Sequence, residues 1–413
     1  MSHLPHAYRR LWWATGIDSL GNGVFTAALP LLTVTVSHDA RDMALVSATT
    51  YLPWLLLSLV AGSVADRVDR IALMWRTQTL QALIVGVLTV LVAAGVVTVP
   101  VLVVLAFALG SCDVFYDNAA QTVLPDLVSK GRLHQANGSQ QVALVVGRQF
   151  GGPPLGSLFF ALAWTLPFAV DAVSFVLAAL LLAGLPRRRH VPSERVKVLD
   201  GLRWLRKHRL LRTLALLLGV NTFCGQFGNA TLVLFVTDVL HLGAGVFGLL
   251  LAGAAVGGIA GGLVIARLVA RLGDLRALLV SLAVNAVVFA GMGFSPNVAV
   301  LGGLLAVSGF VTTIWNVVTV GVRQREVPAS LLGRVNSVYR LLGWGLMPLG
   351  ALTGGLLAHR FGLRVPYPVA GVLRGFALLA ALPVLIPAMR NATPRGVRSA
   401  SAVRTPRGPS RRA

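Results

Sequence analysis

The sequence predicts an all-α membrane protein with twelve transmembrane helices, and three observations support that fold class. Hydrophobic residues make up 56% of the 413-residue chain, charged residues only 12%, and the mean hydropathy is +0.77. A soluble domain carries about twice that charged fraction, roughly 25%. The apolar residues also form repeated blocks of roughly 20, which is the length that spans a bilayer as a helix. Helices satisfy their own backbone hydrogen bonds, as lipid requires, and the sequence lacks the short alternating segments of a β-barrel.

Twelve apolar blocks define the expected spans. Tight turns at Leu166-Pro167 and Ser295-Pro296 are interpreted as hairpins between helices. The first block lacks the short hydrophobic region and cleavage site of a signal peptide, so we expect it to be retained. The expected spans are 11–36, 43–65, 71–94, 99–124, 138–162, 164–185, 212–238, 243–266, 277–295, 297–322, 331–358 and 366–389.

The basic residues predict the orientation. With the N-terminus inside, 30 of the 36 Lys and Arg residues fall on the cytoplasmic side, whereas Arg41, Arg360 and Arg364 fall outside. Excess positive charge marks cytoplasmic loops, so both termini are expected in the cytoplasm. The composition is typical of a bacterium, and the expected location is the inner cell membrane. The net charge of +22 is then explained by topology and contact with anionic lipid headgroups, not by nucleic-acid binding.

The chain divides into four expected regions. The N-terminal six-helix bundle covers 1–186, a cytoplasmic linker 187–211, the C-terminal six-helix bundle 212–389, and a disordered basic tail 390–413. Leu202 and Leu205 follow Val198 and Leu199 near helical spacing within the linker, which predicts a short amphipathic helix on the inner leaflet.

The two halves resemble each other. Pro154-Leu155-Gly156 in the fifth span matches Pro348-Leu349-Gly350 in the eleventh, and similar loop residues precede both. Paired six-helix repeats joined by a long basic loop are typical of transporters that work by alternating access.

Three motifs show a resemblance to the major facilitator superfamily that covers about 8–389. Residues 62–70, GSVADRVDR, match the loop motif G-x-x-x-D-R-x-G-R, with Asp69 at the second Gly position. Residues 115–128 resemble F-D-P-A-R-x-x-x-L-P-x-L of the drug-efflux branch that includes macrolide and enterobactin exporters, with Asn118 and Ala120 as the departures. The closest match is 335–350. The resemblance implies the major facilitator fold, with two pseudo-symmetric six-helix bundles.

The loop motif implies a conformational latch. In the family, residues at the positions of Gly62, Asp66, Arg67 and Arg70 hold the two halves together in the outward-facing state. A charged contact of this kind biases a two-state equilibrium. The alternative is that these are ordinary positive-inside loop charges. Residues 147–156 resemble the family's antiporter motif G-x-x-x-G-P-x-x-G-G, although generic glycine packing explains them equally well.

Charged residues inside spans are functional candidates because lipid makes them costly. Asp18 in the first span, and Asp113 and Asp117 in the fourth, are the expected proton-coupling residues. A carboxylate that faces a cavity can take up a proton on one side and release it on the other. Asp117 could instead make a structural contact with Arg148 or a loop arginine. Arg374 could be a counter-charge or could reach toward the outer headgroups.

A substrate cavity would need a few polar groups in an apolar wall. Each candidate could alternatively make an interhelical hydrogen bond. The expected cavity residues are Asn22, Gln121, Arg148, Asn221, Gln226, Asn229, Trp315, Asn316 and Arg340.

The predicted function is export of a hydrophobic or amphiphilic small molecule, such as a drug, antibiotic or siderophore-like compound, by proton antiport. Lipid flipping or metabolite import on the same fold is the alternative. No nucleophile–base or metal-ligand cluster indicates an enzyme, no phosphate loop indicates ATP coupling, and no cofactor is expected. Cys112 and Cys224 lie within spans and predict no disulfide framework. The expected partners are the substrate, protons and membrane lipids, with the protein acting as a monomer.

Overall fold

A computed structural model describes residues 5–65, 67–129, 132–186 and 198–391 of the chain. These residues are almost entirely helical and contain no β-strand, which confirms the predicted fold class. Ten helical stretches are long and apolar enough to cross a membrane. α2 and the run from α5 to α6 complete the twelve expected positions.

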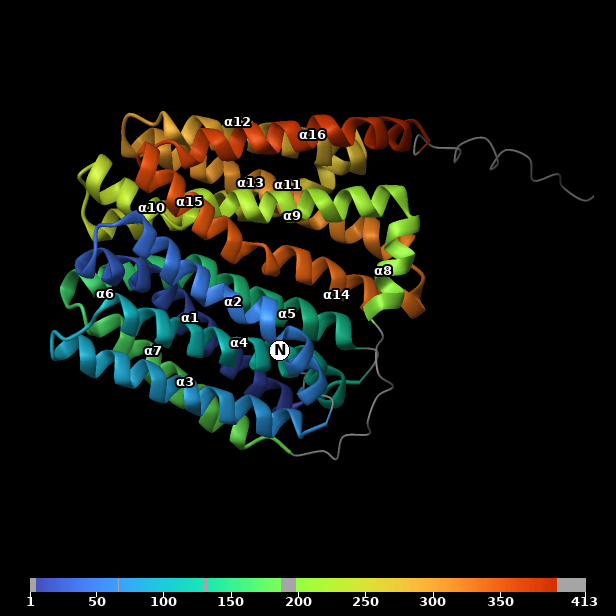
Figure 1. The fold of residues 1–413 in the computed structure, drawn as a ribbon. Helices are drawn as coiled ribbons and strands as arrows, with labels where there is room; N and C mark the ends of the chain where they lie inside the picture. The colour runs from blue at the N-terminus through green and yellow to red at the C-terminus, as the bar shows by residue number, and fades with distance from the viewer. Residues whose placement is uncertain (1–4, 66, 130–131, 187–197, 392–413) are drawn as a thin grey trace, which may run out of the picture.

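The first half contains α1 to α7 (Figure 1). α1 packs against α6 and α7, α2 against α4, and α3 against both α4 and α7. Its helices are α1 (His6–Val36), α2 (Ala40–Ala65), α3 (Arg70–Ala93), α4 (Val99–Leu127), α5 (Leu133–Val145), the π-helix η2 (Val146–Gly151), α6 (Gly152–Leu162) and α7 (Leu166–Ala183).

The second half repeats this plan in α9 to α16. α9 packs against α15 and α16, α11 against α13, and α12 against both α13 and α16. Its helices are α9 (Arg209–Asn229), α10 (Leu232–Leu234), the π-helix η3 (Phe235–Val239), α11 (Ala244–Leu272), α12 (Asp274–Gly293), α13 (Val298–Glu326), α14 (Ala329–Gly345), α15 (Met347–Phe361) and α16 (Pro366–Asn391).

The linker contains one described helix, α8 (Val198–Lys207), between the halves (Figure 1). α8 packs on α14, where Asp200 contacts Arg334 at 3.4 Å, and Leu205 is buried in the core of the second half. The predicted helix is therefore present, and part of its apolar face is covered by protein.

The repeated Pro-Leu-Gly segments occupy equivalent places. A Cβ added at Gly156 of α6 would lie 2.3 Å from the Val24 carbonyl oxygen of α1. A Cβ added at Gly350 of α15 would lie 2.2 Å from the Phe223 carbonyl oxygen of α9. Only glycine allows both approaches, so the sequence repeat corresponds to a repeated close contact between helices.

The two halves meet through helices α2, α6, α11, α14 and α15. We call the end of the bundle that carries α8 the linker end and the opposite end the loop end. At the loop end, His38 lies 3.1 Å from Asp238, and Asp39 lies 3.1 Å from His359. Each of these pairs joins one half to the other. The halves are thus in direct contact at the loop end.

Candidate functional site

Asp18 is the most buried of the predicted carboxylates. It is 2% exposed, and its Oδ1 accepts hydrogen bonds from Gln78 Nε2 at 2.8 Å and Asn22 Nδ2 at 2.9 Å. Asn22 lies one turn along α1, as its spacing predicts. Gln78 comes from α3, and sequence reasoning did not identify it.

Asp113 of α4 has a matching partner. Its Oδ1 accepts a 2.8 Å hydrogen bond from Gln81 Nε2, one turn after Gln78 on α3. Both glutamines are almost completely buried, at 0% and 1% exposure. Two amides three residues apart in an apolar helix lie on one face, and that spacing is the signal that could have identified them.

Arg148 links the carboxylates electrostatically. It lies within range of the charges of Asp18, Asp113 and Asp117, and Asp117 also lies within range of Arg340 from the second half. Arg148 sits in the π-helix η2, between α5 and α6. A π-helix inserts an extra residue per turn and is frequent at functional sites. The structure thus places the three predicted carboxylates, together with the buried Asp171 of α7, within charge range of one arginine.

Glycines bring η2 onto α1. A Cβ added at Gly147 would lie 2.6 Å from the Ser19 Cβ, and one added at Gly152 would lie 2.4 Å from the Gly23 Cα. The neighbours of Asp18 and of Arg148 are therefore in direct backbone contact. The small residues of the antiporter-like segment therefore pack η2 closely on α1, and Arg148 lies within charge range of Asp18.

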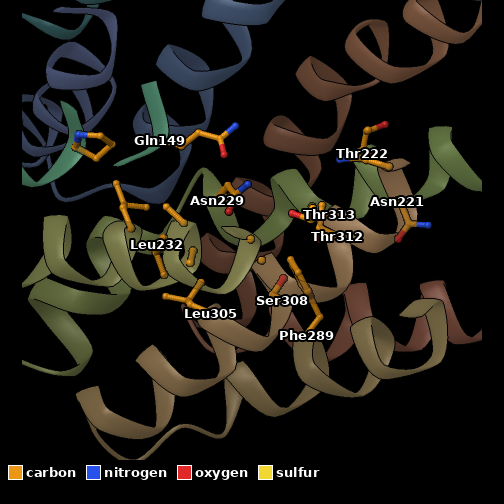
Figure 2. A pocket seen from close by; sticks show the side chains of 18 of the residues that line it. Gln149, Asn221, Thr222, Asn229, Leu232, Phe289, Leu305, Ser308, Thr312 and Thr313 are labelled. Carbon is orange, nitrogen blue, oxygen red and sulfur yellow. The ribbon is translucent and has the colours of Figure 1, made fainter. Parts of the chain in front are cut away.

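A cavity of about 860 Å³ lies beside this cluster. Its wall is formed mainly by α9, α11 and α13 of the second half, together with α1, η2 and α6 of the first half. Figure 2 shows polar side chains, including Gln149, Asn229 and Thr313, among apolar ones such as Leu232, Leu305 and Phe289. The volume falls in the usual range for small-molecule sites, roughly 300–1,000 Å³.

The predicted cavity residues divide into three groups. Five line this cavity: Arg148, Asn221, Gln226, Asn229 and Asn316. Three lie elsewhere: Trp315 is packed in the core of the second half, Asn22 hydrogen-bonds Asp18, and Arg340 lies within charge range of Asp117. The side chain of Gln121 lies outside the described part of the structure.

Arg374 of α16 lines the same cavity, although it was not among the predicted site residues. It is 7% exposed, and it donates from Nη1 to Asn285 Oδ1 at 2.5 Å and from Nη2 to the Asn221 carbonyl oxygen at 2.9 Å. Its guanidinium carbon lies 3.6 Å from the ring centre of Phe289. The suggestion that Arg374 reaches toward the outer headgroups was wrong, because its head group is held between α9 and α12.

The latch motif is only partly described. Asp66 lies outside the described residues, Arg67 is exposed, and Gly62 and Arg70 are partly buried at the ends of α2 and α3. Asp69 has a clear local role, since its side chain accepts hydrogen bonds from the backbone N–H groups of Ile71 and Ala72. The residue that departs from the family motif is therefore the N-cap of α3.

Twelve helical spans in two similar halves, with a polar-lined cavity between them, define a multi-pass membrane transporter of the major facilitator type. The chain belongs to the family described as transmembrane secretion effectors, whose match covers residues 4–406. The resemblance noted in the sequence is confirmed.

Individual proteins agree with this assignment. The chain is 29% identical to the multidrug efflux pump Tap of Mycolicibacterium fortuitum over 397 residues, which cover 90% of this chain and 93% of Tap. It is 26% identical to the enterobactin exporter EntS of Citrobacter koseri over 390 residues, covering 90% and 89% respectively. The crystal structure of a mutant of the nucleoside transporter NupG shares the fold, with a TM-score of 0.77, 12% identity, and coverage of 92% of this chain and 99% of the NupG chain.

Proposed function

We propose that the protein exports a hydrophobic or amphiphilic small molecule across the bacterial cell membrane by proton antiport. The observation that carries this proposal is the position of Arg148, which lines the cavity and also lies within charge range of Asp18, Asp113 and Asp117. One side chain thus connects the space for a substrate with the groups that could carry protons.

The charge balance of the cluster provides a coupling mechanism. Asp18, Asp113 and Asp117, with the buried Asp171 nearby, outnumber Arg148 and Arg340. The excess of negative charge in a site of low dielectric favours the uptake of a proton. Movement of Arg148 on substrate binding would change the electrostatic field at all three carboxylates. A proton could then be released when substrate occupies the cavity, which is the exchange that antiport requires.

The cavity wall supports an amphiphilic cargo. Apolar side chains of α11 and α13 offer a surface for a hydrophobic body, while Asn221, Asn229 and Asn316 offer hydrogen bonds. Tap and EntS are described as exporters, which favours movement out of the cytoplasm. In the expected topology the loop end faces outward, so the described contacts there would correspond to a state closed on the outside.

The proposal can be tested in inverted membrane vesicles with an imposed proton gradient. Uptake of lipophilic cations, macrolides, siderophore-like compounds and amphiphilic anions would be compared for wild type, Asp18→Asn and Asp113→Asn. Asp274→Asn is the control, because it removes a carboxylate whose partner is Arg325 at the surface end of α12.

We expect gradient-dependent uptake in wild type and in the control, and its loss in Asp18→Asn, in Asp113→Asn or in both. Uptake that ignores the gradient, or that survives both changes, would contradict proton coupling through this cluster. If no compound is taken up while lipid or metabolite transport is detected, export of amphiphiles is wrong and the alternative cargo is favoured.

A further inference from the structure

The charges on the cavity wall are not balanced. Among the described residues that line it, the charged side chains are Arg148 and Arg374, and no carboxylate is present. Arg148 has three carboxylates behind it in the first half. Arg374 has no described acidic residue within ion-pair distance.

The hydrogen bonds of Arg374 leave donors unused. A guanidinium offers five N–H groups. The described contacts are one from Nη1 to Asn285 and one from Nη2 to Asn221, and Nε has no partner among the described residues. A buried cation without a counter-ion is costly, so a site that keeps one usually pairs it with an ion or uses it in function.

The surroundings hold the guanidinium in one orientation. One face lies against the ring of Phe289, and Asn285 is itself fixed by donating to Thr312 Oγ1 at 3.1 Å. Gly225 faces the cavity on the Nη2 side, where an added Cβ would lie 3.2 Å from Nη2. A larger residue there would cover the guanidinium, whereas glycine leaves it accessible.

We propose that Arg374 is an anion-binding subsite and that the transported amphiphile carries a carboxylate or a similar acidic group. The inference rests on the proposed export function and narrows its substrate class. The acidic group would supply the counter-ion that Arg374 lacks, in the planar, bidentate geometry that guanidinium favours. The hydrophobic body of the same molecule would lie along the apolar wall formed by α11 and α13.

Binding to the purified full-length protein in lipid nanodiscs tests this without a proton gradient. Two probes share one hydrophobic body: pyrenebutyrate carries a carboxylate and pyrenebutanol does not. Energy transfer from tryptophan to pyrene reports binding of each. We expect wild type to bind pyrenebutyrate at least about tenfold more tightly, because a hydrogen bond to a charged group contributes roughly 1.5–3 kcal/mol.

Three variants and one control separate the effect of charge from an effect on structure. Arg374→Gln should abolish the preference while pyrenebutanol binding stays within about threefold, and Arg374→Lys should restore part of it. Asn285→Asp keeps the arginine and places a carboxylate beside Nη1, so it should also abolish the preference for pyrenebutyrate. This variant keeps the proposal testable if Arg374→Gln does not fold. Arg364→Gln is the control, since Arg364 also donates to backbone carbonyls, those of Gly293 and Ser295, but does not line the cavity.

Absence of the carboxylate preference in wild type, or its persistence in Asn285→Asp, would overturn the proposal. Failure of the anion subsite can be distinguished from failure of the proposed export function. Gradient-driven uptake of a neutral or cationic compound, with no carboxylate preference in the binding assay, would leave antiport standing and remove only the anion subsite.

Discussion

The two halves of the protein each present one arginine to the cavity, and the two arginines have opposite surroundings. Arg148 of the first half is within charge range of three carboxylates, whereas Arg374 of the second half is held by neutral groups and an aromatic ring. A transporter that exchanges protons for a substrate needs a site for each. In the proposed function, the first half would therefore handle protons and the second half would bind the polar group of the substrate.

The largest expected effect comes from removing each arginine in turn. Arg148→Gln removes the arginine that lies within charge range of Asp18 and Asp113, and loss of one partner of a buried charge pair costs about 3 kcal/mol. Arg374→Gln leaves only neutral acceptors behind, so we expect a loss of about 1 kcal/mol. Thermal unfolding in detergent measures both. Equal losses would contradict the difference between the halves, and Arg148→Gln combined with Asp117→Asn should recover part of the stability.

The next effect concerns the repeated helix contacts, in which the halves are alike. Gly156→Ala and Gly350→Ala should each cost about 2 kcal/mol, because a Cβ would collide with the backbone of α1 or α9 and force the helices apart. Gly138→Ala is the matched control, since nothing lies within 4 Å of a Cβ there. Its stability should be unchanged or slightly higher. A neutral result at either contact glycine would show that the helices can separate without cost.

A smaller difference lies at the start of equivalent helices. Asp69 caps α3 with its side chain, whereas α12 begins after Gly273, which has φ of 80° and provides no side-chain cap. Asp69→Ala should cost about 1 kcal/mol and Asp69→Gly only a few tenths. Hydrogen exchange at the amides of Ile71 and Ala72 should accelerate in Asp69→Ala. Unchanged exchange there would mean that the carboxylate does not protect these groups.

The smallest expected effect concerns Asp39, whose contribution to stability should not change with pH between pH 7 and pH 4. Hydrogen bonds from Arg41 lower the pKa of Asp39, in the loop between α1 and α2, from 3.8 to about 2. The contribution of Asp39 to stability is therefore present above pH 3.8 and is lost only as the pH falls through about 2. His359 also contacts Asp39 and can change its charge in this range, so the comparison is made in a His359→Gln background. There, the difference in melting temperature between the proteins with Asp39 and with Asp39→Asn should stay constant from pH 7 to pH 4. A difference that shrinks over this range would show that Asp39 is protonated there.

Much of the fold could be predicted because membrane spans leave a simple signal. The expected span 71–94 corresponds to α3 at Arg70–Ala93, and 366–389 to α16 at Pro366–Asn391. The π-helices η2 and η3 were not predicted, because hydropathy does not record one extra residue in a turn. The break between α14 and α15 at Leu346 was missed because the residues on both sides of it form one continuous apolar stretch.

The candidate site was predicted less completely. Asp18 and Asp113 were identified because a carboxylate in a span stands out by type alone. Their partners Gln78 and Gln81 depend on how α3 is rotated toward α1 and α4, and a single span does not reveal that rotation. Arg374 was visible as a charge, but its direction is set by Asn285 of α12, which is 89 positions away in the sequence.

The most direct test of proton coupling through the first half is to measure proton release during substrate binding. The purified protein, in weakly buffered solution between pH 5 and pH 8, would be mixed with the compound that shows the largest gradient-dependent uptake. We expect that wild type releases protons on binding and that the Asp18→Asn/Asp113→Asn double variant binds the compound without release. Equal release by both proteins, or none by wild type, would contradict the assignment of proton coupling to the first half.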